Sequence, residues 1–254
     1  FLDAGKILSN QTGDTEEGLS YLKAALALAR KIDDSRLQIK ALLRLADHPD
    51  TDTAACMKEA ISLPTESDLD IRSEVISYSL YYSRISGKLE GTEAILKEAH
   101  ELIGKVSDST RVIIANHLAN FYFFRGDYDA AIKSTQLVQE ITKKTNSWLK
   151  YNKSLGILGG CYYVKGQFAK MINTLQESLF IAKRLNEILS IMIISANVLL
   201  AYLRMSQYQE ALRLIEQLVS LREYQDMSRN SPHITQKIAH LYLCLLYTSD
   251  AADE

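Results

Sequence analysis

Residues that interrupt helices are scarce in this chain. Its 254 residues include only 3 prolines and 11 glycines, whereas 47% of the residues are hydrophobic. Proline and glycine are the least favourable residues inside helices, and a fold of many short strands needs turn residues at close intervals. Their scarcity argues against a strand-rich fold and favours long helices. The hydrophobic content is sufficient for those helices to share a continuous core.

Strong charge and paired cysteines are also lacking. The formal net charge is -2, so no strong field draws the chain to nucleic acid or to an anionic membrane. The 3 cysteines, Cys56, Cys161 and Cys244, have no short paired spacing. This pattern argues against a disulfide scaffold or a zinc site, and it indicates a reducing compartment, here the cytoplasm. The uncharged run at residues 188–203 is shorter than the ~20 residues of a membrane span, and we expect a buried helix there.

The two ends of the chain differ from the rest. The sequence begins at Phe1 without a methionine or a charged signal region, so we expect an internal fragment of a longer protein. Residues 244–254, CLLYTSDAADE, resemble one reading frame of the transposase-adapter DNA used to build sequencing libraries. We therefore predict that this segment is a non-native tail and exclude it from the fold. A genuine acidic tail is the alternative.

A repeat of 40 residues organises the chain between these ends. The segments IANHLANFYFFRGDYDAAI and SLGILGGCYYVKGQFAKMI place Tyr122 against Tyr162 and Gly126 against Gly166. The same spacing leads to three further tyrosines, Tyr82, Tyr202 and Tyr242. Self-similarity at a fixed period of this length is typical of stacked repeats, in which neighbouring units bury a shared core.

The repeat predicts an all-α domain over residues 1–243, with six helix pairs and a truncated seventh. Cap and turn residues locate the helix ends. The segment that starts at Ser107 begins a helix, and Pro64 ends another. The sixth pair turns at Ser206, where serine replaces the expected glycine, and the seventh unit begins near Pro232.

These units resemble tetratricopeptide repeats. In that family a large residue, a leucine followed by a small residue, and a tyrosine occupy the first helix. A turn with glycine and an aromatic residue leads to an alanine on the second helix. The clearest unit matches at Leu118, Ala119, Tyr122, Gly126, Tyr128 and Ala131. Two further units match at Leu158, Gly159, Tyr162, Gly166 and Phe168, with Met171 in place of the alanine, and at Val198, Tyr202, Tyr208, Ala211 and Leu218. The period of 40 exceeds the usual ~34, so the helices or the loops must be longer.

The resemblance implies a right-handed α-solenoid of antiparallel helix pairs that needs no cofactor. The long period is similar to the sensor superhelix of large bacterial ATP-dependent transcriptional regulators, and to the repeat regions of some sensor kinases. The implied function is to bind a protein, a peptide or a small effector, as the sensing or interaction arm of a larger bacterial signalling or transcription-regulatory protein. The alternatives are a free-standing scaffold or adaptor and the non-catalytic part of an enzyme such as a sensor kinase.

The candidate catalytic and metal-binding motifs lack residues that such sites require at fixed spacings. Gly87 and Gly104 precede lysines, but the upstream glycine and the following hydroxyl residue of a phosphate loop are missing. Asp47, Asp50 and Asp52 lack the glycine and the bidentate glutamate of a calcium loop, so we interpret them as helix-cap residues. We therefore expect neither enzymatic activity nor a bound metal.

Small residues in the fifth unit have a packing interpretation. Gly156, Gly159 and Gly160 fall inside a predicted helix and not after a strand, which argues against a dinucleotide site. We expect Gly159 and Gly160 to let helices approach closely. Cys161 lies in the same helix without a basic neighbour to lower its pKa, so we expect an unreactive thiol.

In the tetratricopeptide family, the inner helix of each pair lines a concave groove, and the repeat register transfers that face to this sequence. The transferred positions are Ser73, Ile76, Leu80, Ser83, Arg84, Ile113, Asn116, Asn120, Phe123, Phe124, Lys153, Gly156, Gly160, Tyr163, Val164, Ile193, Ala196, Leu200, Leu203, Arg204, His233, Gln236 and His240. None of these residues is acidic, although acids slightly outnumber bases in the chain.

This acid-free composition predicts a groove for a peptide or small effector that has an apolar body and a negative group. The basic residues Arg84, Lys153 and Arg204 are expected to bind carboxylates. Asn116 and Asn120 are expected to clamp an extended peptide backbone. The aromatic residues that supply contact area are Phe123, Phe124 and Tyr163. The alternative is a tight superhelix in which these side chains pack against one another. We expect no direct contact with nucleic acid or membrane.

Overall fold

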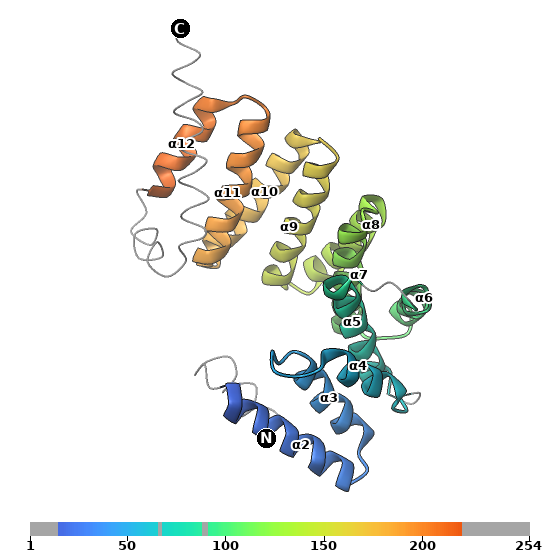
Figure 1. The fold of residues 1–254 in the computed structure, drawn as a ribbon. Helices are drawn as coiled ribbons and strands as arrows, with labels where there is room; N and C mark the ends of the chain where they lie inside the picture. The colour runs from blue at the N-terminus through green and yellow to red at the C-terminus, as the bar shows by residue number, and fades with distance from the viewer. Residues whose placement is uncertain (1–14, 66–67, 88–90, 220–254) are drawn as a thin grey trace. The chain divides into compact units, whose positions relative to one another are not determined.

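The computed structural model describes residues 15–65, 68–87 and 91–219, and these residues form eleven α-helices without a strand (Figure 1). The prediction of an all-α protein is therefore confirmed. The chain divides into two compact units, residues 1–121 and 122–254, and each is considered by itself. Residues 1–14, the predicted seventh repeat and the adapter-like tail lie outside the described residues. One continuous repeat domain over residues 1–243 stays a prediction.

The first unit contains the helices up to α7. They are α2 (Thr15–Lys31), α3 (Ser35–Ala46), α4 (Thr53–Ser62), α5 (Leu69–Ser86), α6 (Thr92–Ile103) and α7 (Asp108–Arg125), the last of which continues past Phe121 into the second unit. Aspartates begin several of these helices, because a carboxylate accepts hydrogen bonds from otherwise unpaired N–H groups. Asp34, Asp52 and Asp68 each accept one from the third following residue. The cap interpretation of Asp52 and the helix stop before Pro64 are confirmed.

The second unit explains the long period. Its helices are α8 (Tyr128–Lys144), α9 (Trp148–Val164), α10 (Phe168–Arg184), α11 (Ile188–Arg204) and α12 (Tyr208–Val219), and each packs on the next. From α8 to α11 each helix has 17 residues, and the helix starts are regularly spaced at 128, 148, 168, 188 and 208. Long helices, and not long loops, therefore account for the period of 40 residues.

Short turns of one kind connect these helices. In each turn, the N–H that follows a left-handed residue donates to a carbonyl five positions earlier, as in a Schellman cap. Gln167 donates to Tyr162 at 2.8 Å, and Gln207 donates to Tyr202 at 2.9 Å. The left-handed position is held by Gly166 with φ of 69° and by Ser206 with φ of 56°. The serine predicted to replace glycine thus adopts the glycine conformation.

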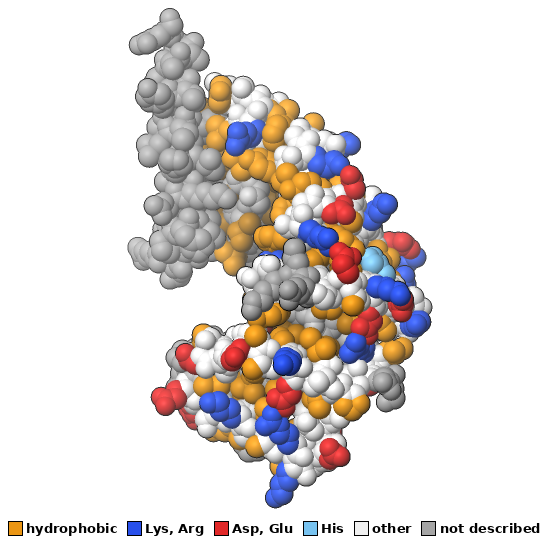
Figure 2. All heavy atoms as spheres, turned by 45° about the vertical axis from the view of Figure 1, so that its right-hand side comes forward, with side chains coloured by type: hydrophobic (Ala, Val, Ile, Leu, Met, Phe, Trp, Pro, Cys, Tyr) orange, Lys and Arg blue, Asp and Glu red, His pale blue; other side chains and the backbone are white. Residues whose placement is uncertain are grey.

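No helix in the described part of the chain combines the length and the hydrophobicity that a membrane span requires. The uncharged run at residues 188–203 lies within α11, where Ile191, Ile194 and Leu199 are buried. Leu189 and Ile193 of the same helix are exposed. The expectation of a helix buried on most sides is confirmed, with one apolar strip left open. Figure 2 shows the surface from one side, with hydrophobic areas between Lys, Arg, Asp and Glu side chains.

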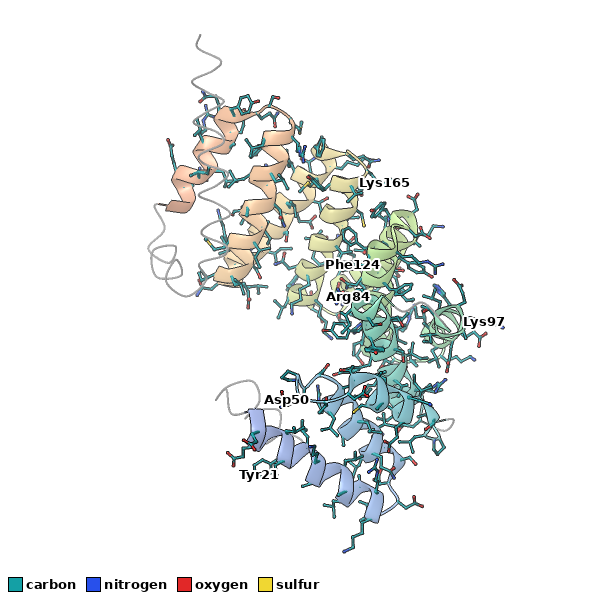
Figure 3. All side chains as sticks on the ribbon, viewed as in Figure 1. Tyr21, Asp50, Arg84, Lys97, Phe124 and Lys165 are labelled. Carbon is teal, nitrogen blue, oxygen red and sulfur yellow. The ribbon has the colours of Figure 1, made fainter. Side chains whose placement is uncertain are left out.

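A few polar contacts join neighbouring helices. Lys165, in the turn between α9 and α10, donates to Asp129 of α8 at 2.8 Å (Figure 3). Tyr151 of α9 donates to Glu177 of α10 at 2.7 Å. In the first unit, Arg36 donates to Asp68 at 2.6 Å. Exposed pairs of this kind contribute little to stability, so the fold depends mainly on its apolar contacts.

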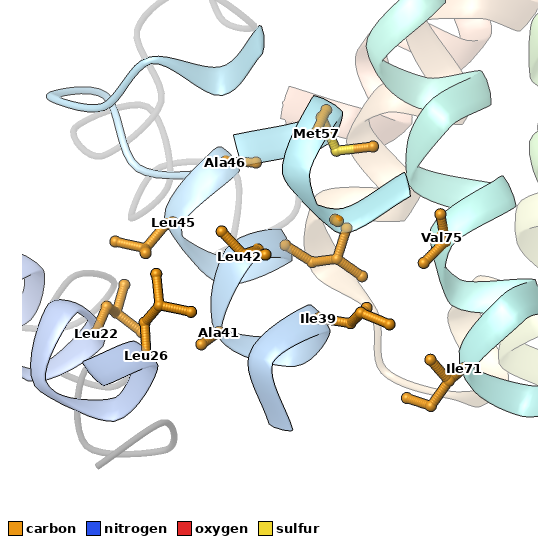
Figure 4. Close-up of a cluster of buried hydrophobic side chains, with 12 residues drawn as sticks. Leu22, Leu26, Ile39, Ala41, Leu42, Leu45, Ala46, Met57, Ile71 and Val75 are labelled. Carbon is orange, nitrogen blue, oxygen red and sulfur yellow. The ribbon is translucent and has the colours of Figure 1, made fainter. Parts of the chain in front are cut away.

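The apolar core of the first unit joins four helices (Figure 4). Leu22 and Leu26 of α2 pack with Leu42 of α3, and the cluster continues to Met57 of α4 and Val75 of α5. Each helix can bury only part of its surface against a single neighbour, so stacking is what completes the burial. Full burial of one such side chain is worth about 1.5–3 kcal/mol.

Candidate functional site

Charge is partitioned between the helices of the second unit. Neither α9 nor α11 contains an acidic residue. The basic residues on these two helices are Lys150, Lys153 and Arg204. The acidic residues in the described part of the unit lie on α8, α10, α12 or in turns: Asp127, Asp129, Glu140, Glu177, Glu187, Glu210 and Glu216. A ligand lying along α9 and α11 would therefore meet basic but no acidic side chains from these two helices.

These helices and the end of α7 expose apolar side chains at positions that correspond in the repeat. We call this surface the acid-free face, and it consists of Phe124, Leu149, Lys153, Val164, Leu189, Ile193 and Arg204. Val164 retains 48% of its accessible surface, Ile193 45%, and Phe124, at the end of α7, 62%. Lys153 and Arg204 are exposed as well. Apolar side chains gathered in this way are typical of binding surfaces, whereas a single exposed one is ordinary.

Phe123 connects the end of α7 to α9. Its ring lies edge-on to those of Phe124 and Tyr128, with centroids 5.6 and 5.8 Å apart. A Cβ atom on Gly160 would lie only 3.1 Å from the Phe123 ring, so the glycine provides the room that this ring occupies. The predicted close approach at Gly160 is confirmed. It holds Phe123 half-buried and leaves Phe124 at the surface.

Tyr163 and Arg204 meet although they lie on different repeats. Arg204 of α11 donates to the Tyr163 hydroxyl of α9 at 3.3 Å. The Tyr163 ring also packs against Phe168, with centroids 5.9 Å apart. The hydrogen bond orients the guanidinium and uses one of its five N–H donors. Tyr163 therefore supports Arg204, and its role as contact area for a ligand stays a prediction.

In the first unit, the predicted asparagine clamp is engaged with its own helix. The side-chain amide of Asn120 donates to the Asn116 carbonyl at 2.8 Å. The Arg84 guanidinium lies over the Tyr81 ring, 5.0 Å from its centroid (Figure 3). His117 is a neighbour that the sequence did not reveal. Burial, and then the nearby Arg84, lower the pKa of His117 below its ordinary value, so this imidazole favours the neutral form.

The groove prediction is wrong for the positions on α5. Ser73, Ile76, Leu80 and Ser83 of α5 are buried, because α3, α4 and α6 pack around this helix. The Ser73 hydroxyl donates to the Leu69 carbonyl at 2.6 Å, so it serves the helix. Ala196 of α11 is buried too. The predicted positions His233, Gln236 and His240 lie outside the described residues.

Cys161 is buried in α9. Burial raises the pKa of its thiol to about 11, although nearby Lys165 acts in the opposite direction. The expectation that Cys161 has no basic neighbour is wrong, because Lys165 follows it by one helical turn. Burial outweighs the effect of Lys165, so the expected low reactivity is supported. Within residues 15–65, 68–87 and 91–219 there is no group of three His, Cys, Asp or Glu side chains that could hold a metal ion.

No protein-family model matches the sequence, and no curated protein matches it. Solved structures do match. One is a Signal Transduction ATPase with Numerous Domains (STAND) protein with a tetratricopeptide repeat sensor from Pyrococcus horikoshii, similar over 91% of this chain with 19% identity and a TM-score of 0.68. Another is a Rap protein complexed with Competence and Sporulation Factor, similar over 99% of this chain with 13% identity and a TM-score of 0.61.

The chain spans 34% of the STAND protein and 73% of the Rap protein. At identities this low, the structural similarity establishes the fold alone, and function does not follow from fold. The chain therefore has the helical-repeat fold of tetratricopeptide solenoids, as its repeat pattern predicted.

Proposed function

We propose that this chain is a non-catalytic binding module and that the acid-free face takes a peptide or small effector with an apolar body and a carboxylate. The observation that carries this proposal is the composition of α9 and α11, which expose apolar and basic side chains but contain no acid. Leu149 and Leu189 would supply apolar area to the ligand. Lys153 and Arg204 would supply charge, and a charge-assisted hydrogen bond is about twice as strong as a neutral one.

Exposure favours this proposal over mutual packing. Side chains that served only to fill the inside of a tight superhelix would be buried within the unit. Val164 and Ile193 instead keep close to half of their surface accessible, with 48% and 45% exposed. Ala196 is buried and Leu200 is half-buried, so these two positions contribute mainly to packing.

Peptide retention from a synthetic library tests the proposal. The immobilised chain should retain short peptides that combine leucine, isoleucine or phenylalanine with a carboxylate, and it should retain amidated counterparts less. Lys153→Glu should lower the affinity for the retained peptides about tenfold, because it reverses a charge on the acid-free face. Calorimetric titration of the individual peptides provides the measurement.

The matched control is Lys97→Glu, the same charge reversal on α6 of the first unit (Figure 3). It should leave the affinity unchanged. Equal affinities of the wild-type chain and the Lys153→Glu chain, with both folded by circular dichroism, would refute the role of the acid-free face.

We further propose that the module is the sensing or interaction arm of a larger bacterial signalling or transcription-regulatory protein. The likeness to a STAND protein with a tetratricopeptide repeat sensor supports this context, as does the small share of that protein that the chain spans. A free-standing scaffold or adaptor, or the non-catalytic part of an enzyme such as a sensor kinase, would use the same fold. Sequencing of the complete gene separates these cases: a sensing arm requires an adjoining ATPase or DNA-binding domain, a sensor kinase requires a kinase domain, and a scaffold requires neither.

A further inference from the structure

A cavity of the second unit lies where α9 begins and α10 ends. It has a volume of about 380 Å³ and is lined by Trp148, Phe180, Ile181, Arg184 and Leu185. Trp148 precedes Lys153 by five residues, which places the two about 140° apart around α9. No residue of the acid-free face lines the cavity, so the inference drawn from it does not depend on the function proposed above.

The preceding repeat shows that the fold does not require aromatic residues here. The positions 40 residues earlier in the chain hold Asp108, Glu140, Ile141, Lys144 and Thr145. Lys144 donates to Glu140 at 2.7 Å, and Arg111 donates to Asp108 at 2.8 Å, as expected of solvated surface positions. In the fifth repeat, Trp148 and Phe180 occupy the positions of these two acids, and their side chains remain 43% and 60% exposed. Exposed aromatics of this size need an explanation other than packing.

The aromatic side chains are held in place by their neighbours. Trp148 lies edge-on to Tyr151, with centroids 6.0 Å apart and ring planes at 90°. Tyr151 is itself fixed, because its hydroxyl donates to Glu177 and Lys143 Nζ lies 4.8 Å from its ring centroid. The Arg184 guanidinium lies 5.7 Å from the Phe180 centroid. Trp148, Phe180 and Arg184 therefore border the cavity in fixed positions, and a ligand could bind without a large movement of these side chains.

The charge at the cavity favours an anion. None of the lining residues is acidic. The carbonyl groups at the end of α10 would repel an anion if they were open, but the turn covers them. Leu185 donates to the Ile181 carbonyl at 3.0 Å, and Glu187 donates to the Ala182 carbonyl at 3.0 Å. Arg184 is therefore not required to pair with these carbonyls and is available to a ligand.

We propose that this cavity binds a small aromatic carboxylate. The ring of the ligand contacts Trp148 and Phe180 above the apolar floor of Ile181 and Leu185, and the carboxylate accepts hydrogen bonds from Arg184. Ligand sites generally have volumes of about 300–1,000 Å³, with mostly apolar walls and a few polar groups that fix orientation. A cavity of about 380 Å³ is near the lower end of this range and suits a ligand with a single ring.

Fluorescence of the intact chain tests this site, because Trp148 is its single tryptophan. Phenylacetate is the probe, and phenylacetamide, which has the same ring but no charge, is its neutral counterpart. Phenylacetate should change the Trp148 emission saturably, with an affinity about tenfold above that of the amide. Absence of a saturable change, or equal affinity for the two compounds, would overturn the proposal.

Two variants assign the roles within the cavity. Arg184→Gln should weaken phenylacetate about tenfold and leave phenylacetamide unchanged. Phe180→Gln, which places an uncharged analogue of the equivalent Glu140 at this position, should weaken both compounds. The matched control is Lys144→Gln, which alters the equivalent of Arg184 in the preceding repeat. It should retain wild-type affinity, and an Arg184→Gln chain that does the same would contradict the assignment.

Discussion

Gly156 and Gly159 lie three residues apart on α9 and meet opposite surroundings. A Cβ atom on Gly159 would lie 2.8 Å from Cδ2 of Leu175, which is buried, whereas nothing lies within 4 Å of a Cβ on Gly156. The sequence placed both glycines in one helix. The repeat predicted a close helix approach at Gly159 and placed Gly156 on the groove face. The distance to Leu175 depends on α10 and comes only from the structure.

This contrast predicts opposite effects on stability. Gly156→Ala should raise the free energy of unfolding by about 0.5–1 kcal/mol, because alanine has the higher helix propensity and meets no neighbour. Gly159→Ala should lower it by about 1 kcal/mol, because overpacking against Leu175 outweighs the same gain in propensity. Urea unfolding followed by circular dichroism measures both changes. A stabilised Gly159→Ala chain would show that α9 and α10 can separate at little cost.

Cys161 gives the second prediction at the residue scale. Folding raises the pKa of its thiol from 9.0 to about 11, so the folded state holds the proton more tightly than the unfolded state does. Below pH 9 the thiol is protonated in both states. As the pH rises from 9 towards 11 the unfolded thiol ionises first, and the free energy of unfolding should fall.

Cys161→Ala isolates this effect from other groups that titrate in the same range. The variant should lose stability less steeply than the wild type between pH 9 and pH 11, as measured by urea unfolding at a series of pH values. Parallel declines in the two chains would show that Cys161 is not the group that senses alkaline pH.

At the scale of elements, the helix and its turn form a module of constant length. The helices from α8 to α11 have 17 residues each, and the left-handed turn position recurs at Asn146, Gly166, Asn186 and Ser206. The period of 40 residues predicted the glycine-containing turns and Ser206. It did not identify Asn146 and Asn186 as their counterparts between repeats, although asparagine is the residue that tolerates this conformation best after glycine.

The turns predict a reciprocal pair of substitutions. Gly166→Ala should lower the free energy of unfolding by about 1 kcal/mol, because a Cβ atom is unfavourable at its φ of 69°. Ser206→Gly should raise it by about 0.5 kcal/mol, because relief at φ of 56° exceeds the added flexibility of the unfolded chain. Thermal unfolding of both variants against the wild type provides the measurement. A destabilised Ser206→Gly chain would show that the serine side chain supports the turn by contacts of its own.

At the scale of the whole molecule, the surface carries two separate indications of binding. The acid-free face extends along α9 and α11 and follows the repeat register from one unit to the next. The cavity beside Trp148 departs from that register, because the preceding repeat has acids at the equivalent aromatic positions. The Lys153→Glu chain should therefore lose affinity for the retained peptides, and the Arg184→Gln chain should lose affinity for phenylacetate.

The sequence by itself determined the helical-repeat fold, the positions of most turns and the acid-free composition of α9 and α11. These properties are local or periodic, so they can be obtained from spacing and residue type. Only the tertiary structure decided which positions are open. It showed that the packing around α5 buries Ser73 and Leu80, and that Asn120 bonds to its own helix. It also brought Trp148 and Phe180, 32 residues apart in the chain, to one cavity. Exposure and such contacts depend on neighbouring helices, which the periodicity of a single helix does not specify.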